Sequence, residues 1–510
     1  MTDTPVAHPR TPARRPAGAR PRPAATATAT ATPVAGPPAT PHGSDLHLEL
    51  AATGGRRAAL MAALREAIRS GRLAPGTRLP PYRSLAADLG IARNTAADAY
   101  AELAAEGWLT ARQGSGTTVA DRAEPIAPTR ARRSPPAHRP AHDLRQGRPD
   151  TASFPRTAWL AAGRRALTAA PNEAFGPGDP QGRRELRVAL ADYLARARGV
   201  RTDPDRIVVC SGFAHALRLL FDGPGAVLGG PAAGPLAVEA YGLAFHRALL
   251  ARAGVTTVPL PLDEDGARVG TLAGYPEVRT ALVTPAHQFP TGGPLHASRR
   301  AAVVDWARGH GALVLEDDYD GEFRYDRRPV GALQGLDPER VVYLGSVSKS
   351  LSPALRLGWM VLPEQLVDRV LAAKGEREAW ASALDQLTLA EFIDSGGYDQ
   401  HVRRTRRRYR DRRDHLLAAL AARAPSIEVS GIAAGLHAVL RLPPGTERSV
   451  LKAAAYRGLA LDGLADYRHP RIGLDAMPAA DGLVVGYAAP ADHAYQAAVA
   501  ALCDVLPDPL

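Results

Sequence analysis

The feature that most constrains the fold of this chain is a series of short apolar runs between residues 143 and 510. Each run is followed by polar or glycine-bearing residues and then by a segment with helical character. The clearest runs are RIVVC (206–210), TALVT (280–284), GALVLE (311–316) and VVYLG (341–345). Strands that are buried on both faces and alternate with helices are typical of doubly wound sheets. The pattern therefore predicts an α/β domain built on a mainly parallel sheet.

Two stretches rich in proline and arginine precede that domain. Residues 1–44 consist mostly of Pro, Ala, Thr and Arg without hydrophobic periodicity, so we expect a disordered tail. Residues 45–120 have a globular composition, and residues 121–142 form a second Pro- and Arg-rich stretch that we interpret as a linker. The sequence thus predicts a small N-terminal domain, a linker and a large domain over residues 143–510.

Charge and cysteine content narrow the class of protein. The net charge of +11 permits a polyanionic partner. The two cysteines, Cys210 and Cys503, form no CxxC pair and no Cys/His cluster, which argues against a disulfide framework and a structural zinc site. No apolar run reaches membrane-spanning length, and the first residues lack the order of a secretory signal. We therefore expect a cytoplasmic protein without a metal site.

Residues 45–120 carry the pattern of three helices and a two-stranded wing. The predicted helices are Arg57–Ser70, Tyr82–Leu89 and Arg93–Trp108. The second and third are separated by a turn that contains Gly90, a spacing typical of a helix-turn-helix. The segment WLTARQGSGTTV (108–119) predicts a hairpin with Gly114 and Gly116 at its turn. Arg83, Arg93, Asn94 and Thr95 fall at helix starts, where side chains can reach phosphates and base edges.

Any one of these polar residues alone fits an ordinary solvated helix start equally well. Their order together with the hairpin closely resembles the winged helix-turn-helix domain of the GntR family of bacterial regulators, through about 75 residues that include 69–119. The resemblance implies that DNA is contacted by Arg83, Arg93, Asn94, Thr95, Gln113 and Gly114. The chain departs from the family at Ala92, where Ser or Thr is usual, and this change removes either a helix cap or a phosphate contact worth ~1 kcal/mol.

The segment GSVSKSLSPALRLGW (345–359) places Lys349 directly after a predicted strand. A lysine amine becomes chemically special when it condenses with a carbonyl, and pyridoxal phosphate is the commonest partner. A lone lysine that follows a strand is, however, more often a surface residue. The S-x-x-K spacing also fits penicillin-binding enzymes, but their S-D-N and K-T-G triplets are absent from the sequence.

The ends of the other predicted strands carry groups that pyridoxal phosphate requires. Open α/β sheets bind ligands at the carboxyl ends of their strands, and a helix start there offers N–H groups to a phosphate. The expected ligands are Ser211, Gly212, Phe213, Ala214, Ser346, Ser348 and Arg356 for the phosphate, Asp317 for the pyridinium, Tyr319 for the phenolic oxygen, and His287 in the turn PAHQFPTGG beneath the ring. Each of these strand-end segments alone also fits an ordinary loop, and EDDYD also fits a metal site. Four such segments in this order at successive strand ends favour a cofactor site.

Residues 143–510 are similar to fold-type I aminotransferases, from DLRQGRPDTASFPRTAW (143–159) and GDPQGRRELRVALADYLARARGV (178–200) onward. Behind a GntR-type domain, this arrangement resembles the MocR subfamily of transcriptional regulators. The resemblance implies that Lys349 binds pyridoxal 5'-phosphate covalently and that the domain is a homodimeric, head-to-tail effector sensor. It also implies a large subdomain at about 172–385 and a smaller α+β subdomain at about 143–171 plus 386–510.

Several positions depart from the aminotransferase pattern. Pro177, with Phe175 nearby, stands where a Tyr reaches the phosphate, and Phe289 stands where Asn precedes Pro-Thr-Gly. Leu243 occupies the position of the ring-stacking aromatic residue, with Tyr241 as a substitute. Val484 replaces the arginine that binds the substrate carboxylate, which leaves Arg468 as the candidate for that role. These departures favour a sensor with little transaminase turnover.

The sequence therefore predicts a DNA-binding regulator in which the aminotransferase-like domain senses the cofactor or an amine or amino acid. One alternative is a working aminotransferase with an appended DNA-binding domain, and another is a regulator whose large domain only dimerises. The basic run RRTRRRYRDRRDH (403–415) fits either a DNA-backbone contact or a solvated helix of the small subdomain. We favour the solvated helix.

Overall fold

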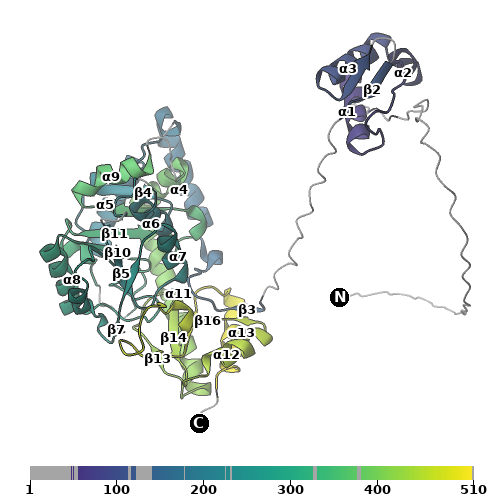
Figure 1. Cartoon of the computed structure of the whole chain (residues 1–510). Helices are drawn as coiled ribbons and strands as arrows, with labels where there is room; N and C mark the ends of the chain where they lie inside the picture. Colours follow the sequence, from purple (N-terminus) through teal and green to yellow (C-terminus); the bar gives the residue numbers. More distant parts are fainter. Residues whose placement is uncertain are drawn as a thin grey trace, which may run out of the picture. The chain divides into compact units, whose positions relative to one another are not determined.

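Figure 1 shows the computed structural model, which describes residues 48, 50, 55–112, 116–121, 140–176, 178–223, 225–229, 233–325, 330–375 and 381–507. The chain divides into two compact units, Met1–Pro136 and Ala137–Leu510. Among the described residues, no helix is both long enough and apolar enough to cross a membrane.

The first unit has three helices and one hairpin. They are α1 (Arg56–Arg69), α2 (Tyr82–Asp88), α3 (Arg93–Ala105), β1 (Leu109–Arg112) and β2 (Gly116–Val119). The strands pair antiparallel, with Leu109 opposite Val119. Helical spacing places Leu60 and Leu64 of α1 and Leu103 of α3 in one buried core. The predicted helices and wing are thus present, with ends that differ by up to three residues from those expected.

The second unit is built on a seven-stranded sheet in the order β4-β12-β11-β10-β9-β5-β6. Its strands are β4 (Ile207–Cys210), β5 (Leu236–Glu239), β6 (Thr257–Leu260), β9 (Thr280–Val283), β10 (Leu313–Asp317), β11 (Val341–Ser346) and β12 (Gly358–Val361). Strand β12 runs antiparallel to both of its neighbours, and the other pairs are parallel. The four apolar runs of the sequence are β4, β9, β10 and β11, so the prediction of a mainly parallel sheet is confirmed.

Helices cover both faces of this sheet, because alternate strand residues point to opposite sides. The helices are α4 (Arg156–Ala169), α5 (Arg184–Arg198), α6 (Phe213–Phe221), α7 (Ala244–Arg252), α8 (Ala297–His310), α9 (Glu364–Lys374) and α10 (Ala383–Asp394). Along β4, Val209 packs with α4, α5 and α10 on one face, whereas Val208 packs with α6 and α9 on the other. The carboxyl ends of the parallel strands remain free for a site.

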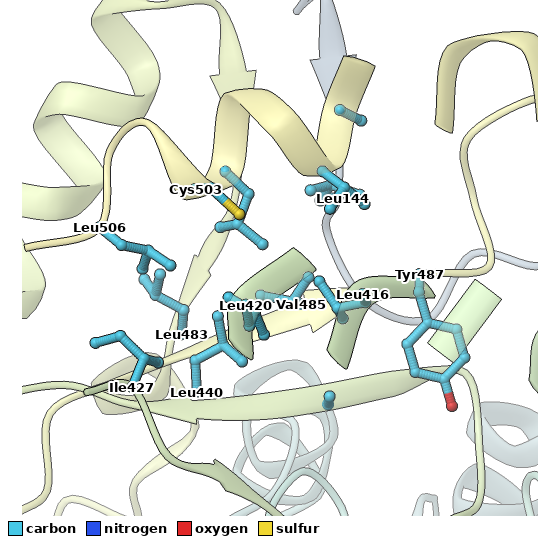
Figure 2. Packing of buried hydrophobic residues seen from close by; sticks show 14 of the residues in the cluster. Leu144, Leu416, Leu420, Ile427, Leu440, Leu483, Val485, Tyr487, Cys503 and Leu506 are labelled. Atoms are coloured by element: carbon cyan, nitrogen blue, oxygen red, sulfur yellow. The ribbon is translucent and has the colours of Figure 1, made fainter. Parts of the chain in front are cut away.

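A smaller subdomain is built on a four-stranded antiparallel sheet, β13-β14-β17-β16. Its elements are β3 (His142–Asp143), α11 (Gly397–Arg423), β13 (Val429–Ser430), β14 (His437–Arg441), α12 (Glu447–Tyr456), β15 (Leu459–Ala460), β16 (Asp462–Gly463), β17 (Gly482–Gly486) and α13 (Asp492–Cys503). A two-stranded sheet, β7 (Leu262–Asp263) with β8 (Gly266–Ala267), belongs to the large subdomain's edge. Figure 2 shows Leu416 and Leu420 of α11 over Leu440 and Leu483 of the sheet, within one buried cluster.

The boundary between the subdomains differs from the expected one. All of helix α4 and most of helix α10 were expected in the small subdomain. In the structure the two helices pack against each other and into the core of the large sheet. The apolar faces of these helices complete that core, which fixes their place. Helix α11 crosses between the subdomains, since Val402 packs in the large core and Leu420 in the small one.

Candidate functional site

In the first unit, two arginines expected to contact DNA meet at one tyrosine. The guanidinium carbons of Arg83 and Arg93 lie 6.0 and 5.8 Å from the ring centroid of Tyr82. Hydrogen bonds from Arg93 and Arg83 lower the pKa of the hydroxyl of the half-buried Tyr82. Both arginines are exposed, and neither forms an ion pair with another described residue. Two guanidinium groups at the starts of α2 and α3 thus offer a binding site to a phosphate.

The start of α3 adds backbone donors to these side chains. Ala92 is the N-cap and provides no side-chain cap, so the first-turn N–H groups beside Asn94 and Thr95 stay available to an anion. Asn94 is exposed and Thr95 is half-buried. Gln113 and Gly114, the expected wing contacts, lie outside the described residues.

In the second unit, a cavity of about 300 Å³ lies at the carboxyl ends of the parallel strands. The predicted residues that line it are Gly212, Phe213, Ala214, Tyr241, Asp317, Tyr319, Ser346, Ser348, Lys349 and Arg356. Three predicted residues, Ser211, His287 and Arg468, are not part of its wall. The structure therefore brings ten of the expected groups together from β4, β5, β10 and β11.

The Lys349 amine is held inside the cavity. Its Nζ donates a hydrogen bond to the carbonyl oxygen of Gly147 at 2.5 Å. Burial lowers the pKa of Lys349, and the carboxylates of Asp320 and Asp317 act against that shift. A lowered pKa increases the neutral fraction of the amine, which is the form that attacks a carbonyl.

The Asp317 carboxyl group ends strand β10 and faces the same cavity. Its pKa is raised well above the usual value by burial and by the neighbouring carboxylates of Asp318 and Asp320, while Lys349 acts against the shift. No hydrogen-bond partner of its side chain lies among the described residues. A bound cationic N–H group would supply the missing partner and favour the ionised form.

Tyr319 and His287 belong to one buried hydrogen-bond network. The Tyr319 hydroxyl lies 2.9 Å from His287 Nδ1, and Asp320 Oδ2 lies 2.8 Å from the same nitrogen. Burial, followed by the Asp320 carboxylate, raises the pKa of Tyr319 well above its usual value. The Tyr319 hydroxyl therefore stays protonated at the cavity wall. His287, which does not line the cavity, holds that hydroxyl in position.

The expected phosphate groups converge at the start of α6. Gly212 precedes this helix with φ of 99°, a conformation that favours glycine, and the first-turn N–H groups at Phe213 and Ala214 border the cavity. The backbone N–H of Ser211 donates to His215 Nδ1 at 3.0 Å, so it serves the loop itself. Arg356 is exposed at the cavity and has φ of 52°. A strained backbone of this kind is typical of a residue placed for binding.

The departures seen in the sequence form an apolar wall. Phe289 packs with ring centroids 5.7 Å from Tyr319, 5.2 Å from His437 and 5.4 Å from Tyr467. Tyr241 and Val484 are buried in the same cluster, and Leu243 lies partly buried against it. Pro177 lies outside the described residues. Phe289, Tyr241 and Leu243 line the cavity and offer a ligand shape and little polarity, whereas Val484 is not part of the cavity wall.

Arg468, which was expected to bind a ligand carboxylate, lies outside the cavity wall. The Arg468 guanidinium donates to the backbone carbonyls of Pro478, Ile472 and Met477, at 3.2, 3.3 and 2.7 Å. These bonds close its own loop, and the side chain stays outside the cavity wall. The local sequence does not reveal which groups the Arg468 guanidinium binds, because every residue has a backbone carbonyl that could accept a hydrogen bond.

Sequence reasoning missed four ionisable groups in the cavity wall, Glu239, His246, Arg247 and His437. Glu239 ends strand β5, and burial raises its pKa to about 7 although Thr284 and Gln288 donate to it. Burial lowers the pKa of His246 to about 4 and that of His437 to about 3, so both are neutral near pH 7. The position of Glu239 at a strand end was the one available signal.

The donor set fits pyridoxal phosphate. Asp317 can pair with the ring nitrogen, Tyr319 can donate to the phenolic oxygen, and Lys349 can bind the aldehyde carbon. Three kinds of donor are available to the phosphate: the guanidinium of Arg356, the hydroxyls of Ser346 and Ser348, and the N–H groups at the start of α6. Each group of the cofactor thus has a chemically matched partner on one cavity.

Comparison with known protein families agrees with both units. Residues 56–119 match the family described as "Bacterial regulatory proteins, gntR family", and residues 141–464 match "Aminotransferase class I and II". The chain is 34% identical over 410 residues to the HTH-type pyridoxine biosynthesis transcriptional regulator PdxR of Corynebacterium glutamicum, covering 79% of this chain and 87% of that protein. It is 33% identical to the probable rhizopine catabolism regulatory protein MocR of Rhizobium meliloti, covering 83% and 88%.

Solved structures show the same fold for the second unit. The kynurenine aminotransferase of Pyrococcus horikoshii has a TM-score of 0.63 and 24% identity, covering 71% of this chain and 90% of that one. An archaeal alanine:glyoxylate aminotransferase has a TM-score of 0.63 and 23% identity, covering 72% and 90%. At this level of identity the likeness shows the fold alone.

Proposed function

Because this chain belongs to the MocR subfamily of GntR-family transcriptional regulators, we propose that it is a regulator whose aminotransferase-like domain binds pyridoxal phosphate and senses an amine or amino acid. The winged helix-turn-helix binds an operator on double-stranded DNA, and effector binding at the cofactor changes operator affinity or bending. The observation that carries the proposal is the convergence of Lys349, Asp317, Tyr319 and Arg356 on one cavity. When bound, the cofactor supplies an electrophilic carbon and an electron-withdrawing ring.

A direct contact links this cavity to the segment that follows the linker. The Gly147 carbonyl, which accepts from Lys349 Nζ, lies four residues after β3. The same segment is held by Asp143, which pairs with Arg145 and Arg148 at 2.7 Å each. A covalent bond at Nζ would reduce the number of N–H groups available to Gly147 and change their direction, so occupancy of the site would alter the segment that follows the linker.

We also propose that the protein acts as a homodimer at the nucleoid in the bacterial cytoplasm, where its operator is. Leu160 on α4, Leu384 on α10 and Phe175 are 71%, 45% and 53% exposed. Helix α10 packs against α4 and against the short 3-10 helix η2 (Asn172–Phe175), so the three exposed side chains belong to neighbouring elements. An exposed apolar surface of this kind favours association with a second copy. A dimer would also bring two DNA-binding domains to two half-sites.

The first experiment is the near-visible absorption spectrum of the purified chain with added pyridoxal phosphate, for wild type and Lys349→Ala. The expected result is a band of lysine-bound cofactor in the wild type only. Operator binding is then measured by fluorescence anisotropy, with and without cofactor and candidate amines. An operator affinity and footprint that respond to none of them would overturn the proposal in favour of a purely dimerising domain.

The second candidate function is a working aminotransferase with an appended DNA-binding domain. The fold and the cofactor groups favour it, since they are those of the enzymes. The apolar Phe289 and Val484 at positions of substrate-binding residues weigh against it. Sustained conversion of an amino acid with a keto-acid acceptor, abolished in Lys349→Ala, would establish the enzyme instead.

A further inference from the structure

The cavity contains a guanidinium group for which the cofactor contacts above have no use. Arg247 lies on helix α7, is half-buried, and forms part of the cavity wall. Its Nη1 donates to the carbonyl oxygens of Gly242 and Tyr467 at 2.6 and 3.1 Å. Its Nη2 donates to the carbonyl oxygen of Arg468 at 3.3 Å. These bonds fix the guanidinium against the cavity without using all five of its N–H groups.

The three partners of Arg247 are all neutral. No ion pair joins Arg247 to a carboxylate among the described residues, and burial lowers its pKa with no acid acting against the shift. Arg299 provides the contrast, because its ion pair with Asp263 raises its pKa. A half-buried cation without a counter-ion costs free energy that an anionic ligand would recover.

Arg247 connects the cavity wall to the small subdomain. Arg356 and the start of α6 belong to loops of the large subdomain, whereas Arg247 is tied to Tyr467 of the small one. The Tyr467 ring lies 5.4 Å from the ring of Phe289, and Phe289 lies 5.7 Å from Tyr319. Arg247 therefore lies where α7 meets the segment Tyr467–Arg468 of the small subdomain.

We propose that Arg247 binds the carboxylate of the effector, and that the effector is therefore an amine that also carries a carboxylate. This inference rests on the proposed function, because it requires the amine end of the effector to meet the cofactor at Lys349. It assigns to α7 the role that Val484 and Arg468 do not fill. The bonds from Arg247 to Gly242 and Tyr467 would then transmit ligand binding to both subdomains.

The test compares matched amines on the cofactor-loaded full chain, with the near-visible band as the readout. The pairs are L-phenylalanine with 2-phenylethylamine, and 4-aminobutyrate with 1-butylamine. In the wild type, at least one carboxylate-bearing amine is expected to reach half of its full effect at a concentration about tenfold lower than its partner. This ratio corresponds to ~1.4 kcal/mol of binding free energy. Operator affinity, measured by anisotropy, is expected to respond in the same order.

Two variants of Arg247 and one control variant locate the effect. Arg247→Gln retains amide donors for the backbone carbonyls but lacks the charge, so the gap within each pair should fall below about threefold while the simple amines respond as before. Arg247→Lys retains the charge and should preserve part of the gap. Arg468→Gln, whose native side chain donates to backbone carbonyls only, should leave the gap unchanged. Thermal unfolding of each variant shows whether the fold is retained.

The outcomes separate this inference from the function on which it rests. A cofactor band that responds equally to both members of each pair in the wild type would overturn the carboxylate assignment and leave the sensor intact. A gap that persists in Arg247→Gln would place the carboxylate elsewhere. A wild-type protein that forms no band with pyridoxal phosphate would overturn the proposed function itself, and this inference with it.

Discussion

The guanidinium of Arg198 holds the carboxylate of Asp318 in a two-point ion pair, with Nε–Oδ2 and Nη2–Oδ1 distances of 2.6 and 2.9 Å. The two side chains are 5% and 2% exposed, and the Tyr343 hydroxyl donates to the same carboxylate at 2.7 Å. Asp318 stands between Asp317 and Tyr319, which both line the cavity. The pair therefore fixes the backbone that presents the two groups expected at the pyridine ring.

Replacing Arg198 with Met should destabilise the large domain by about 3–5 kcal/mol, because Asp318 would be left buried without a counter-ion. The measurement is urea unfolding of the cofactor-free chain, followed by tryptophan fluorescence. Arg196→Met is the matched control, since Arg196 pairs with Asp399 on the surface and is 59% exposed. That variant should lose at most about 1 kcal/mol. Equal losses for both variants would contradict a special role for the buried pair.

Glu239→Gln should flatten the dependence of stability on pH. The pKa of Glu239 is about 7 in the folded chain, against the ordinary 4.5 for the unfolded one. Between these values the folded state binds more protons, so stability falls as pH rises from about 4.5 through about 7, by up to ~3 kcal/mol. Because Gln cannot ionise, the part of the pH dependence of stability that comes from Glu239 should vanish in the variant.

The measurement is the urea midpoint of wild type and Glu239→Gln at pH 5, 6, 7 and 8, without cofactor. Glu316 and Glu322 are also buried with pKa values raised to about 7, so part of the slope should remain in the variant. An unchanged slope in Glu239→Gln would show that this carboxyl group is already ionised in the folded protein at low pH.

Covalent trapping should find the cofactor on one lysine. The chain has three lysines, Lys349, Lys374 and Lys452. Lys374 donates to the carbonyl oxygen of Val209 at 2.7 Å, and Lys452 is exposed on α12. After loading with pyridoxal phosphate and reduction with borohydride, peptide mass spectrometry should place stoichiometric label on Lys349. Stoichiometric label on Lys452 instead would contradict the assignment of the site.

The sequence was sufficient to predict the features that depend on local pattern. Strands buried on both faces appear as continuous apolar runs, and a loop at a strand's carboxyl end opens toward the site, so the sequence alone could group Asp317, Tyr319 and Lys349. The helices of the N-terminal unit were equally visible, because each has its own apolar spacing and its own breaker.

The features that depend on the approach of distant segments could not be predicted. Arg247 and Arg468 look alike in the sequence, and only the fold shows that one lines the cavity while the other closes its own loop. The bond between Lys349 and Gly147 joins residues 202 positions apart. The subdomain to which α10 belongs could not be predicted, because this helix has apolar residues on most of its surface and the sequence does not say which core receives them.

The DNA-binding surface makes a prediction that salt titration can test. Arg83 and Arg93 lie exposed at the starts of α2 and α3 and meet at Tyr82, without carboxylate partners among the described residues. If each binds a phosphate, Arg83→Gln and Arg93→Gln should each weaken binding to specific and non-specific DNA alike. The slope of log K against log salt should become shallower by about one for each variant.

Arg65→Gln is the matched control within the same domain, because Arg65 already pairs with Glu106, with an Nε–Oε2 distance of 3.0 Å. A guanidinium neutralised within the protein releases no counterions from DNA, so its loss should leave the salt slope unchanged. Anisotropy titrations at four salt concentrations measure all three variants. A double variant of Arg83 and Arg93 with the wild-type slope would mean that the phosphates are bound elsewhere on the winged domain, and that this pair serves Tyr82 alone.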